Sequence, residues 1–255
     1  MTTTKLKTAN ALTFVFAIVM NTLANAMPLG GMNTGELSAL YPNLFVPAGF
    51  TFSIWGVIYL ALTAHLIWQW VGDSDKVVRA IGPWLAINFI ANGTWIAVWH
   101  AQMVYASIAV MLVLLFSLIK LYRLLAVDYK LNGLQYKVPI SIYLGWISVA
   151  TIANVTTVLV HSGVTELGLG AELWTVLMVT TAALLAVGFL WTRRDVFYAA
   201  VIIWAAYGIY SRRVADTASM DGSIETTAMA VMVIIGILTA LQLGTLLLRN
   251  SSQPH

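Results

Sequence analysis

The residues with the clearest chemical potential lie in one apolar stretch, 139–154. Tyr143, Trp146, Ala150 and Asn154 recur there at steps of three or four residues, so they share one face of a helix. Unpaired polar groups are costly in hydrocarbon, and these side chains therefore need partners on other helices or on a ligand. A lining of indoles and amides suits a flat, largely apolar ligand with a few polar edges.

Three other apolar segments show the same kind of pattern. Asn88, Asn92, Trp95 and Trp99 form one helical stripe, Trp55 and Tyr59 share a face, and Asn21 and Asn25 share another. We expect these faces to surround one pocket. The candidate ligand-binding residues are Asn21, Asn25, Phe52, Trp55, Tyr59, Asn88, Asn92, Trp95, Tyr143, Trp146, Ala150 and Asn154.

Each group of candidates also has a purely structural interpretation. Tryptophans near the ends of membrane helices usually form the interfacial belt, which would explain Trp70, Trp84, Trp99 and Trp191. Asparagine in a membrane helix often joins helices by hydrogen bonds without touching a ligand. For Asn154 the two interpretations are equally good. Trp55 and Trp146 lie deeper, where a belt role explains less.

The sequence lacks the residues that several kinds of chemistry require. The chain has no cysteine, and its four histidines show no metal-ligand spacing, so we expect no metal site. His65 alone lies well inside an apolar segment, where a hydrogen-bonded packing role is favoured over haem ligation. No Asp, Glu, Lys or Arg lies in the middle of an apolar segment, which argues against an ion-coupled pump and against hydrolytic catalysis.

The elements that must hold these residues follow from composition. Hydrophobic residues make up 60% of the 255, charged residues only 9%, and the mean hydropathy is +0.85. A soluble domain carries about 25% charged residues. The sequence therefore predicts an all-α, multi-pass membrane bundle with about eight spans. They lie near 9–27, 50–71, 81–99, 103–125, 138–161, 172–191, 196–211 and 226–248.

The basic residues orient these spans. With the N-terminus in the cytoplasm, all 13 Lys and Arg fall in cytoplasmic segments except Arg212 and Arg213, as the positive-inside rule requires. Both termini are then cytoplasmic, and a bacterial inner membrane is the expected location. The basic residues are scattered rather than clustered, so nucleic acid is not an expected partner.

The chain divides into two expected units, residues 1–165 with five spans and residues 166–255 with three. The longest outer loop, 28–48, is rich in Gly, Pro and Asn and suits a lid over the pocket. Gly93, Ala97 and Ala101 form a ridge of small residues that permits close helix approach. This ridge suits either a homodimer contact or packing within the bundle.

Three motifs resemble those of the TspO/MBR family, the tryptophan-rich sensory proteins related to the mitochondrial translocator protein. The first lies in 139–154, and the second runs from Pro47 through Phe50, Phe52 and Trp55 to Tyr59. The third is Asn88, Asn92 and Trp95. The resemblance covers roughly residues 9–165, and the last three spans have no counterpart in the five-helix family.

The resemblance implies a five-helix bundle that binds porphyrins, haem-like tetrapyrroles or sterol-like molecules beneath the first loop, and a frequent homodimer. No cofactor is required, although porphyrin or haem is a possible ligand. The main hypothesis is a membrane sensor or regulator whose Trp55, Trp95 and Trp146 stack on the ligand while Asn92 and Asn154 orient it. The alternatives are a transporter of a small lipophilic molecule, or an enzyme for light-dependent porphyrin breakdown with Trp55 and Trp146 as redox-active groups.

Overall fold

The computed structural model describes residues 2–27, 31–127, 133–164, 166–216 and 222–251, and within them every regular element is helical. The all-α prediction is confirmed. The short helices are α2 (Thr34–Ala39), η2 (Gly49–Ser53), α4 (Asp75–Ile81) and η4 (Glu166–Gly168). The long helices are α1 (Thr3–Asn25), α3 (Ile54–Val71), α5 (Trp84–His100), α6 (Val104–Val127), α7 (Leu134–His161), α8 (Ala171–Arg193), α9 (Val196–Ala215) and α10 (Ser223–Ser251).

Six stretches of these helices are long and apolar enough to cross a membrane: Thr3–Asn25, Gly49–Val71, Val104–Ala126, Leu134–His161, Ala171–Arg193 and Ser223–Thr245. A seventh crossing requires α4 and α5 to act together, although they meet at an angle of 62°. Gly82, with φ of +54°, and Pro83 make this bend. The α9 helix covers the remaining predicted span, but Arg212 and Arg213 lie in its last turn and lower its hydropathy. A polytopic bundle is thus shown, and the count of eight stays a prediction.

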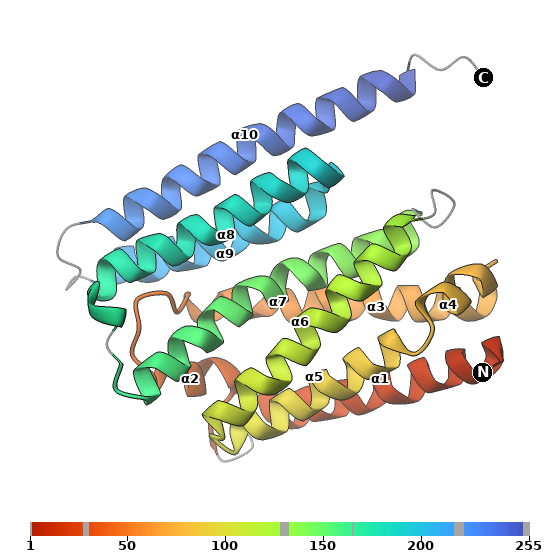
Figure 1. Cartoon of the computed structure of the whole chain (residues 1–255), viewed down its shortest axis with the longest axis horizontal. Coiled ribbons are helices and arrows are strands. Elements are labelled where there is room, and N and C mark those ends of the chain that lie inside the picture. Colours follow the sequence, from red (N-terminus) through yellow and green to blue (C-terminus); the bar gives the residue numbers. More distant parts are fainter. Residues whose placement is uncertain (1, 28–30, 128–132, 165, 217–221, 252–255) are drawn as a thin grey trace.

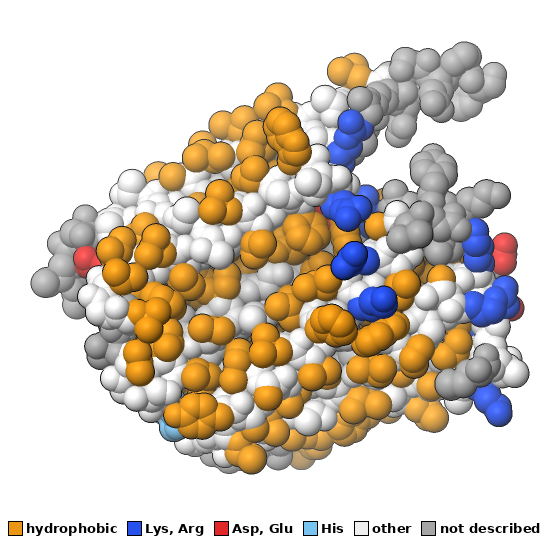
Figure 2. Space-filling model, viewed as in Figure 1, with side chains coloured by type: hydrophobic (Ala, Val, Ile, Leu, Met, Phe, Trp, Pro, Cys, Tyr) orange, Lys and Arg blue, Asp and Glu red, His pale blue; other side chains and the backbone are white. Residues whose placement is uncertain are grey.

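The long helices run roughly alongside one another, and both termini lie at the same end of the bundle (Figure 1). We call this the terminal end and the opposite one, where α2 lies, the lid end. On the face shown in Figure 2, the Lys and Arg side chains gather towards the terminal end. Large apolar side chains are exposed along the helices, as a surface facing lipid requires; they include Leu12, Leu60, Phe116, Leu184 and Leu241.

Two groups of helices share one continuous core. The first comprises α1, α3, α5, α6 and α7, and the second comprises α8, α9 and α10 (Figure 1). The α9 helix joins them by packing against α7, where a side chain on Gly145 would meet Val201. Asp195 fixes the start of α9, since its Oδ1 accepts from the backbone N–H groups of Phe197 and Tyr198. Its Oδ2 accepts from Tyr122 on α6 at 2.7 Å and Ser141 on α7 at 2.6 Å.

A chain of buried polar groups joins α1, α3 and α7 near the terminal end. Pro139 has no N–H to bond the carbonyl of Gln135 four residues earlier. The His65 ring fills that vacancy, with Nδ1 3.1 Å from the carbonyl oxygen. Because a carbonyl only accepts, Nδ1 carries the proton, and Nε2 accepts from Gln69 Nε2 at 2.9 Å. Gln69 in turn accepts from Asn10 on α1 at 3.2 Å. We call this the His65 chain.

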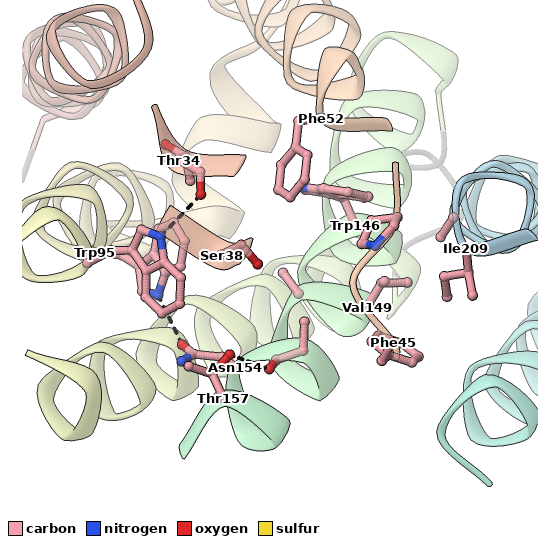
Figure 3. A pocket seen from close by; sticks show the side chains of 15 residues that line it. Thr34, Ser38, Phe45, Phe52, Trp95, Trp146, Val149, Asn154, Thr157 and Ile209 are labelled. Carbon is pink, nitrogen blue, oxygen red and sulfur yellow. Dashed lines mark hydrogen bonds between the residues drawn. The ribbon is translucent and has the colours of Figure 1, made fainter. Parts of the chain in front are cut away.

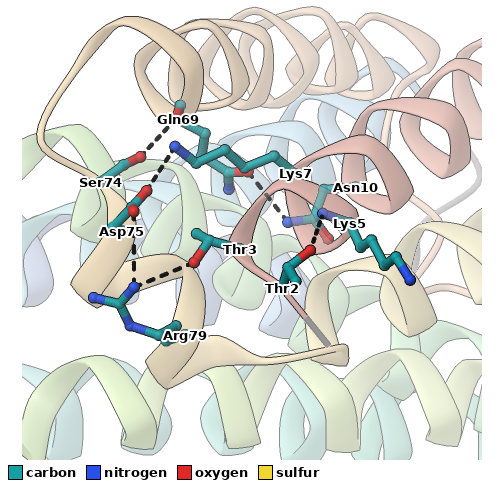
Figure 4. A network of polar contacts seen from close by, with 9 residues as sticks. All are labelled: Thr2, Thr3, Lys5, Lys7, Asn10, Gln69, Ser74, Asp75 and Arg79. Carbon is teal, nitrogen blue, oxygen red and sulfur yellow. Dashed lines mark hydrogen bonds and ion pairs between the residues drawn. The ribbon is translucent and has the colours of Figure 1, made fainter.

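Figure 4 shows the part of this region nearest the N-terminus. Lys7 on α1 pairs with Asp75 on α4 at 2.8 Å, and Arg79 lies 3.7 Å from the same carboxylate. Arg79 also donates to Thr3 at 3.2 Å. The hydrogen bond from Lys7 holds the pKa of the exposed Asp75 carboxyl below its ordinary value.

The small-residue ridge of α5 is partly used within the chain. Gly93 is buried, and a Cβ at this position would collide with the ring of Phe16 on α1. Ala97 and Ala101 are exposed. Gly93 therefore serves α1–α5 packing, and the homodimer stays a prediction.

Candidate functional site

Two tryptophans of α5 form one wall of a cavity at the lid end. The Trp95 and Trp99 rings stack with centroids 5.3 Å apart and planes 13° apart, as their spacing of one helical turn permits. The indole N–H of Trp95 donates to Asn154 Oδ1 on α7 at 3.1 Å, and Asn154 Nδ2 donates to Ser107 on α6 at 2.9 Å. This arrangement fixes the angle of the indole wall.

An edge-to-face cluster of aromatic rings forms the facing wall. Trp146 on α7 meets Phe52 at a centroid distance of 5.9 Å and Trp55 at 6.4 Å, both nearly perpendicular. Trp146 is only 3% exposed. Its indole N–H has no hydrogen-bond partner among the described residues. Because a buried unpaired donor costs about 1–3 kcal/mol, this group is suited to an acceptor brought by a ligand.

The cavity between these walls is almost entirely apolar. Figure 3 shows Trp95 on one side and Phe52 with Trp146 on the other. Its volume is about 60 Å³, counted as the space open to the centre of a water-sized molecule. We call it the aromatic cavity. It is lined by Thr34, Ser38, Phe45, Pro47, Phe52, Trp95, Trp99, Trp146, Val149, Ala150, Ala153, Asn154, Thr157, Ala205 and Ile209.

The lid that covers the cavity, residues 31–48, is held at both ends. On the α2 side, the backbone N–H of Thr34 donates to Asn25 Oδ1 at 3.2 Å, and Trp99 Nε1 donates to the Thr34 carbonyl at 3.4 Å. At the other end, the N–H of Ala48 donates to the carbonyl of Gly208 on α9 at 2.9 Å. Just beyond the lid, Trp204 donates to the Thr51 carbonyl at 2.9 Å. The lid is therefore seated on α1, α5 and α9.

A second hollow, which we call the lateral cleft, opens between α1 and α3. It has a volume of about 340 Å³ on the same measure. Thr34 and Phe52 belong to the walls of both hollows, so they form the partition between the cleft and the aromatic cavity. The cleft is lined by Ile18, Asn21, Thr22, Asn25, Ala26, Thr34, Phe52, Trp55 and Tyr59.

The structure distributes the twelve predicted residues over three environments. Phe52, Trp95, Trp146, Ala150 and Asn154 line the aromatic cavity. Asn21, Asn25, Trp55 and Tyr59 line the lateral cleft, together with Phe52. The remaining residues, Asn88, Asn92 and Tyr143, line neither hollow.

Asn92 lies at the centre of a polar cluster that ties four helices together. Its Oδ1 accepts from Asn21 on α1 at 2.8 Å and Tyr59 on α3 at 3.2 Å, and its Nδ2 donates to Tyr143 on α7 at 2.7 Å. Asn88, one turn earlier on α5, points instead at α6, where its amide donates to Ser117 at 2.9 Å. These bonds agree with the interhelical interpretation of both asparagines.

No pattern in the sequence indicated that α9 contributes to the site. Ala205 and Ile209 complete the aromatic cavity, and both are ordinary apolar residues in an apolar helix. Phe45 and Pro47 of the lid were also missed, although the lid itself was expected. His65 was expected to be a packing residue, and its two ring nitrogens indeed face Gln135 and Gln69.

Comparison with known protein families shows to which family this chain belongs. The sequence model described as TSPO-like protein matches residues 7–241. This chain belongs to the TSPO-like family. The resemblance to TspO/MBR proteins is thereby confirmed. The match extends beyond the predicted range of 9–165, through α8 and α9 of this TSPO-like protein into α10. No curated protein and no solved structure matches it.

Proposed function

We propose that this TSPO-like protein is a membrane sensor or regulator that binds a flat, largely apolar ligand in the aromatic cavity. Porphyrin-like and sterol-like molecules have the required shape. One observation supports the proposal most strongly: Trp146 belongs to the wall of a largely apolar cavity, and its buried indole N–H has no partner among the described residues. A ligand oxygen there would accept the hydrogen bond that the protein does not supply.

The chemistry of the walls favours a planar ligand. The stacked Trp95–Trp99 pair offers an indole face, and Ala150 and Ala153 present only small side chains to the cavity. The amide of Asn154 is already engaged by Trp95 and Ser107. In this proposal Trp95 supplies stacking, Trp146 orients the ligand, and Asn154 holds Trp95.

The cavity must enlarge to admit such a ligand. A volume of about 60 Å³ holds only a few water-sized molecules, which is far less than a tetrapyrrole needs. Phe52 separates this space from the larger lateral cleft, and it is only partly buried. Rotation of its ring would merge the two hollows, and Trp55 and Tyr59 would then join the site.

We further propose that the chain crosses a bacterial inner membrane eight times. In chain order α4 with α5 makes the third crossing and α9 the seventh, and both termini lie in the cytoplasm. The support is that the eight long helices return the chain to its starting end, where the basic side chains gather (Figures 1 and 2).

A tryptophan-quenching titration with protoporphyrin IX in detergent micelles tests ligand binding. We expect saturable quenching in the unaltered protein. Ala150→Phe places a ring inside the cavity and should weaken binding by about a hundredfold, equivalent to about 2.7 kcal/mol. Ala64→Phe is the matched control, because Ala64 is exposed on α3 and should leave the affinity unchanged. Equal affinities for the two variants, or no saturable quenching at all, would refute the proposal.

A transport function is the second candidate, favoured by the position of Phe52 between the aromatic cavity and the lateral cleft. Such an arrangement could pass a lipophilic molecule between the bilayer and the lid end. Flux in reconstituted vesicles distinguishes the two functions. Passage no faster than through empty vesicles would dismiss transport and leave binding in place.

A further inference from the structure

A polar cavity, which we call the arginine cavity, lies at the lid end beside the aromatic cavity. Its volume is about 270 Å³ on the measure used above. The lid forms one wall, and the start of α8 and the end of α9 form the others. It is lined by Ala39, Tyr41, Pro42, Asn43, Leu44, Val46, Ala171, Arg212, Arg213 and Asp216.

Arg213 is a buried cation with incomplete pairing. The residue is 4% exposed, and its Nη1 lies 3.4 Å from Asp216 Oδ2. Charge-assisted hydrogen bonds usually span about 2.7–2.9 Å, so this contact is long. The buried Nε of Arg213 has no hydrogen-bond partner among the residues that the structure describes. A guanidinium presents five donors in a planar fork, and this one leaves part of its capacity unused.

The charged residues that line this cavity favour an anion by a small margin. Two arginines and one aspartate line it, which leaves one net positive charge in the wall. Glu225 on α10 also acts electrostatically on Arg213, although it does not line the cavity. Arg212 is exposed and adds a cation at the cavity edge. These two arginines are also the exceptions to the charge asymmetry that orients the bundle.

The arginine cavity and the aromatic cavity share two walls. On α9, Ala205 and Ile209 line the aromatic cavity, and Arg213 follows one turn later on the same helical face. In the lid, Phe45 and Pro47 face the aromatic cavity while Leu44 and Val46 face the arginine cavity. The non-helical segment 44–47 therefore contributes alternate residues to the walls of both cavities.

We propose that the arginine cavity binds the carboxylate of an amphipathic ligand whose apolar body occupies the aromatic cavity. The inference rests on the proposed function and adds a ligand class to it. The two carboxylate oxygens match the guanidinium fork of Arg213 and supply the acceptor that its Nε lacks. Arg212 strengthens the attraction from the cavity edge. The segment 44–47 shifts aside as the ligand bridges the two cavities.

Protoporphyrin IX and its dimethyl ester provide matched probes, because the ester keeps the ring and loses both carboxylates. Tryptophan quenching should show the acid binding about tenfold more tightly than the ester, as expected for a charge-assisted bidentate contact. Arg213→Gln should abolish that preference and leave the ester affinity unchanged. Arg193→Gln, at the exposed terminal end of α8, is the control and should keep the preference.

Each outcome of this experiment is decisive. Equal binding of acid and ester to the unaltered protein overturns the carboxylate site and leaves the proposed function standing. The carboxylate site is also overturned if Arg213→Gln still binds the ester measurably but loses affinity for the acid and the ester equally. If Arg213→Gln binds neither probe because it fails to fold, Arg212→Gln decides: a halved or smaller preference supports the site, and an unchanged one overturns it. If neither probe binds the unaltered protein, the proposed function fails as well.

Discussion

The His65 chain and the aromatic cavity are both buried and both involve α7, yet their polar groups differ in whether they have partners. In the His65 chain, Gln69, His65 and the Gln135 carbonyl bond to one another, and only the Oδ1 of Asn10 lacks a described partner. In the wall of the aromatic cavity, Trp146 has a buried indole N–H without a partner among the described residues. The first arrangement stabilises the bundle, and the second leaves a donor unpaired, which the proposed ligand would use.

This contrast separates the two interpretations that the sequence left open for its intramembrane polar residues. A group that pairs with another helix should affect the free energy of unfolding when it is replaced. A group that faces a cavity without a partner should affect ligand affinity instead. The next three predictions probe this distinction, beginning with the largest expected effect.

Gln69→Leu breaks the His65 chain in its middle, because it leaves both His65 Nε2 and the Asn10 amide without their partner. We expect the free energy of unfolding to fall by about 1–3 kcal/mol. Porphyrin affinity should change less than twofold, since Gln69 lines neither hollow. Denaturation in mixed micelles measures the first effect, and quenching measures the second.

Gln135→Leu is the matched control for Gln69→Leu, because its exposed side chain changes in the same way while its backbone carbonyl still accepts from His65. Similar stability losses in the two variants would mean that the His65 chain has no special role. A large loss of porphyrin affinity in Gln69→Leu would remove the distinction between the two regions.

Trp146→Phe should show the reverse behaviour. The variant removes an indole N–H that the described residues leave unpaired, so relief of its cost of about 1–3 kcal/mol should offset part of the stability lost with the ring volume. Affinity for protoporphyrin IX should fall about five- to tenfold, or about 1–1.4 kcal/mol. Isothermal titration calorimetry measures affinity without depending on the fluorescence of the replaced tryptophan. Unchanged affinity would show that the ligand does not use this donor.

The smallest expected effect is the loss of the stability contributed by Asp75 at acidic pH. Its pKa is held below the ordinary value, chiefly by the hydrogen bond from Lys7, so the folded state favours the ionised carboxylate. This contribution is fully present above about pH 5 and is lost as the pH falls through the lowered pKa. The thermal midpoint of Asp75→Asn should lie slightly below that of the unaltered protein at pH 7, and the difference should vanish in acid.

Asp73→Asn is the control for Asp75→Asn, since the exposed Asp73 lies two residues earlier in the chain. A difference that persists at low pH would show that Asp75 acts through something other than its charge. The porphyrin affinity of Asp75→Asn should be unchanged, because the ion pair lies far from the lid end.

The sequence predicted the class of fold well because membrane solvation imposes it on the chain. Apolar length dictates helices, and the predicted ranges fall on long helices throughout the described residues. The bend between α4 and α5 escaped prediction, since the predicted span near 81–99 includes Gly82 and Pro83 without allowing for a bend. Hydropathy also identifies α9 less clearly as a membrane span, because its final turn holds two arginines.

The site was predictable only as far as helical periodicity reaches. Periodicity placed Asn88 and Asn92 on one face, but it could not tell that Asn88 meets Ser117 on α6 while Asn92 meets Tyr143 on α7. The partner depends on helix packing, which a single helix does not encode. Ala205 and Ile209 were invisible for a related reason, because apolar wall residues resemble lipid-facing ones until their neighbours are known.

Pro139 has a consequence for sequence variation. Its missing N–H creates the free Gln135 carbonyl that His65 occupies, so the two side chains are linked although no atom of one bonds to the other. A substitution of Pro139 that restores the helical bond removes the requirement for a donor at position 65. Among TSPO-like proteins of this length, we therefore expect the two positions to change together, with proline accompanied by a donor side chain and its absence by an apolar one.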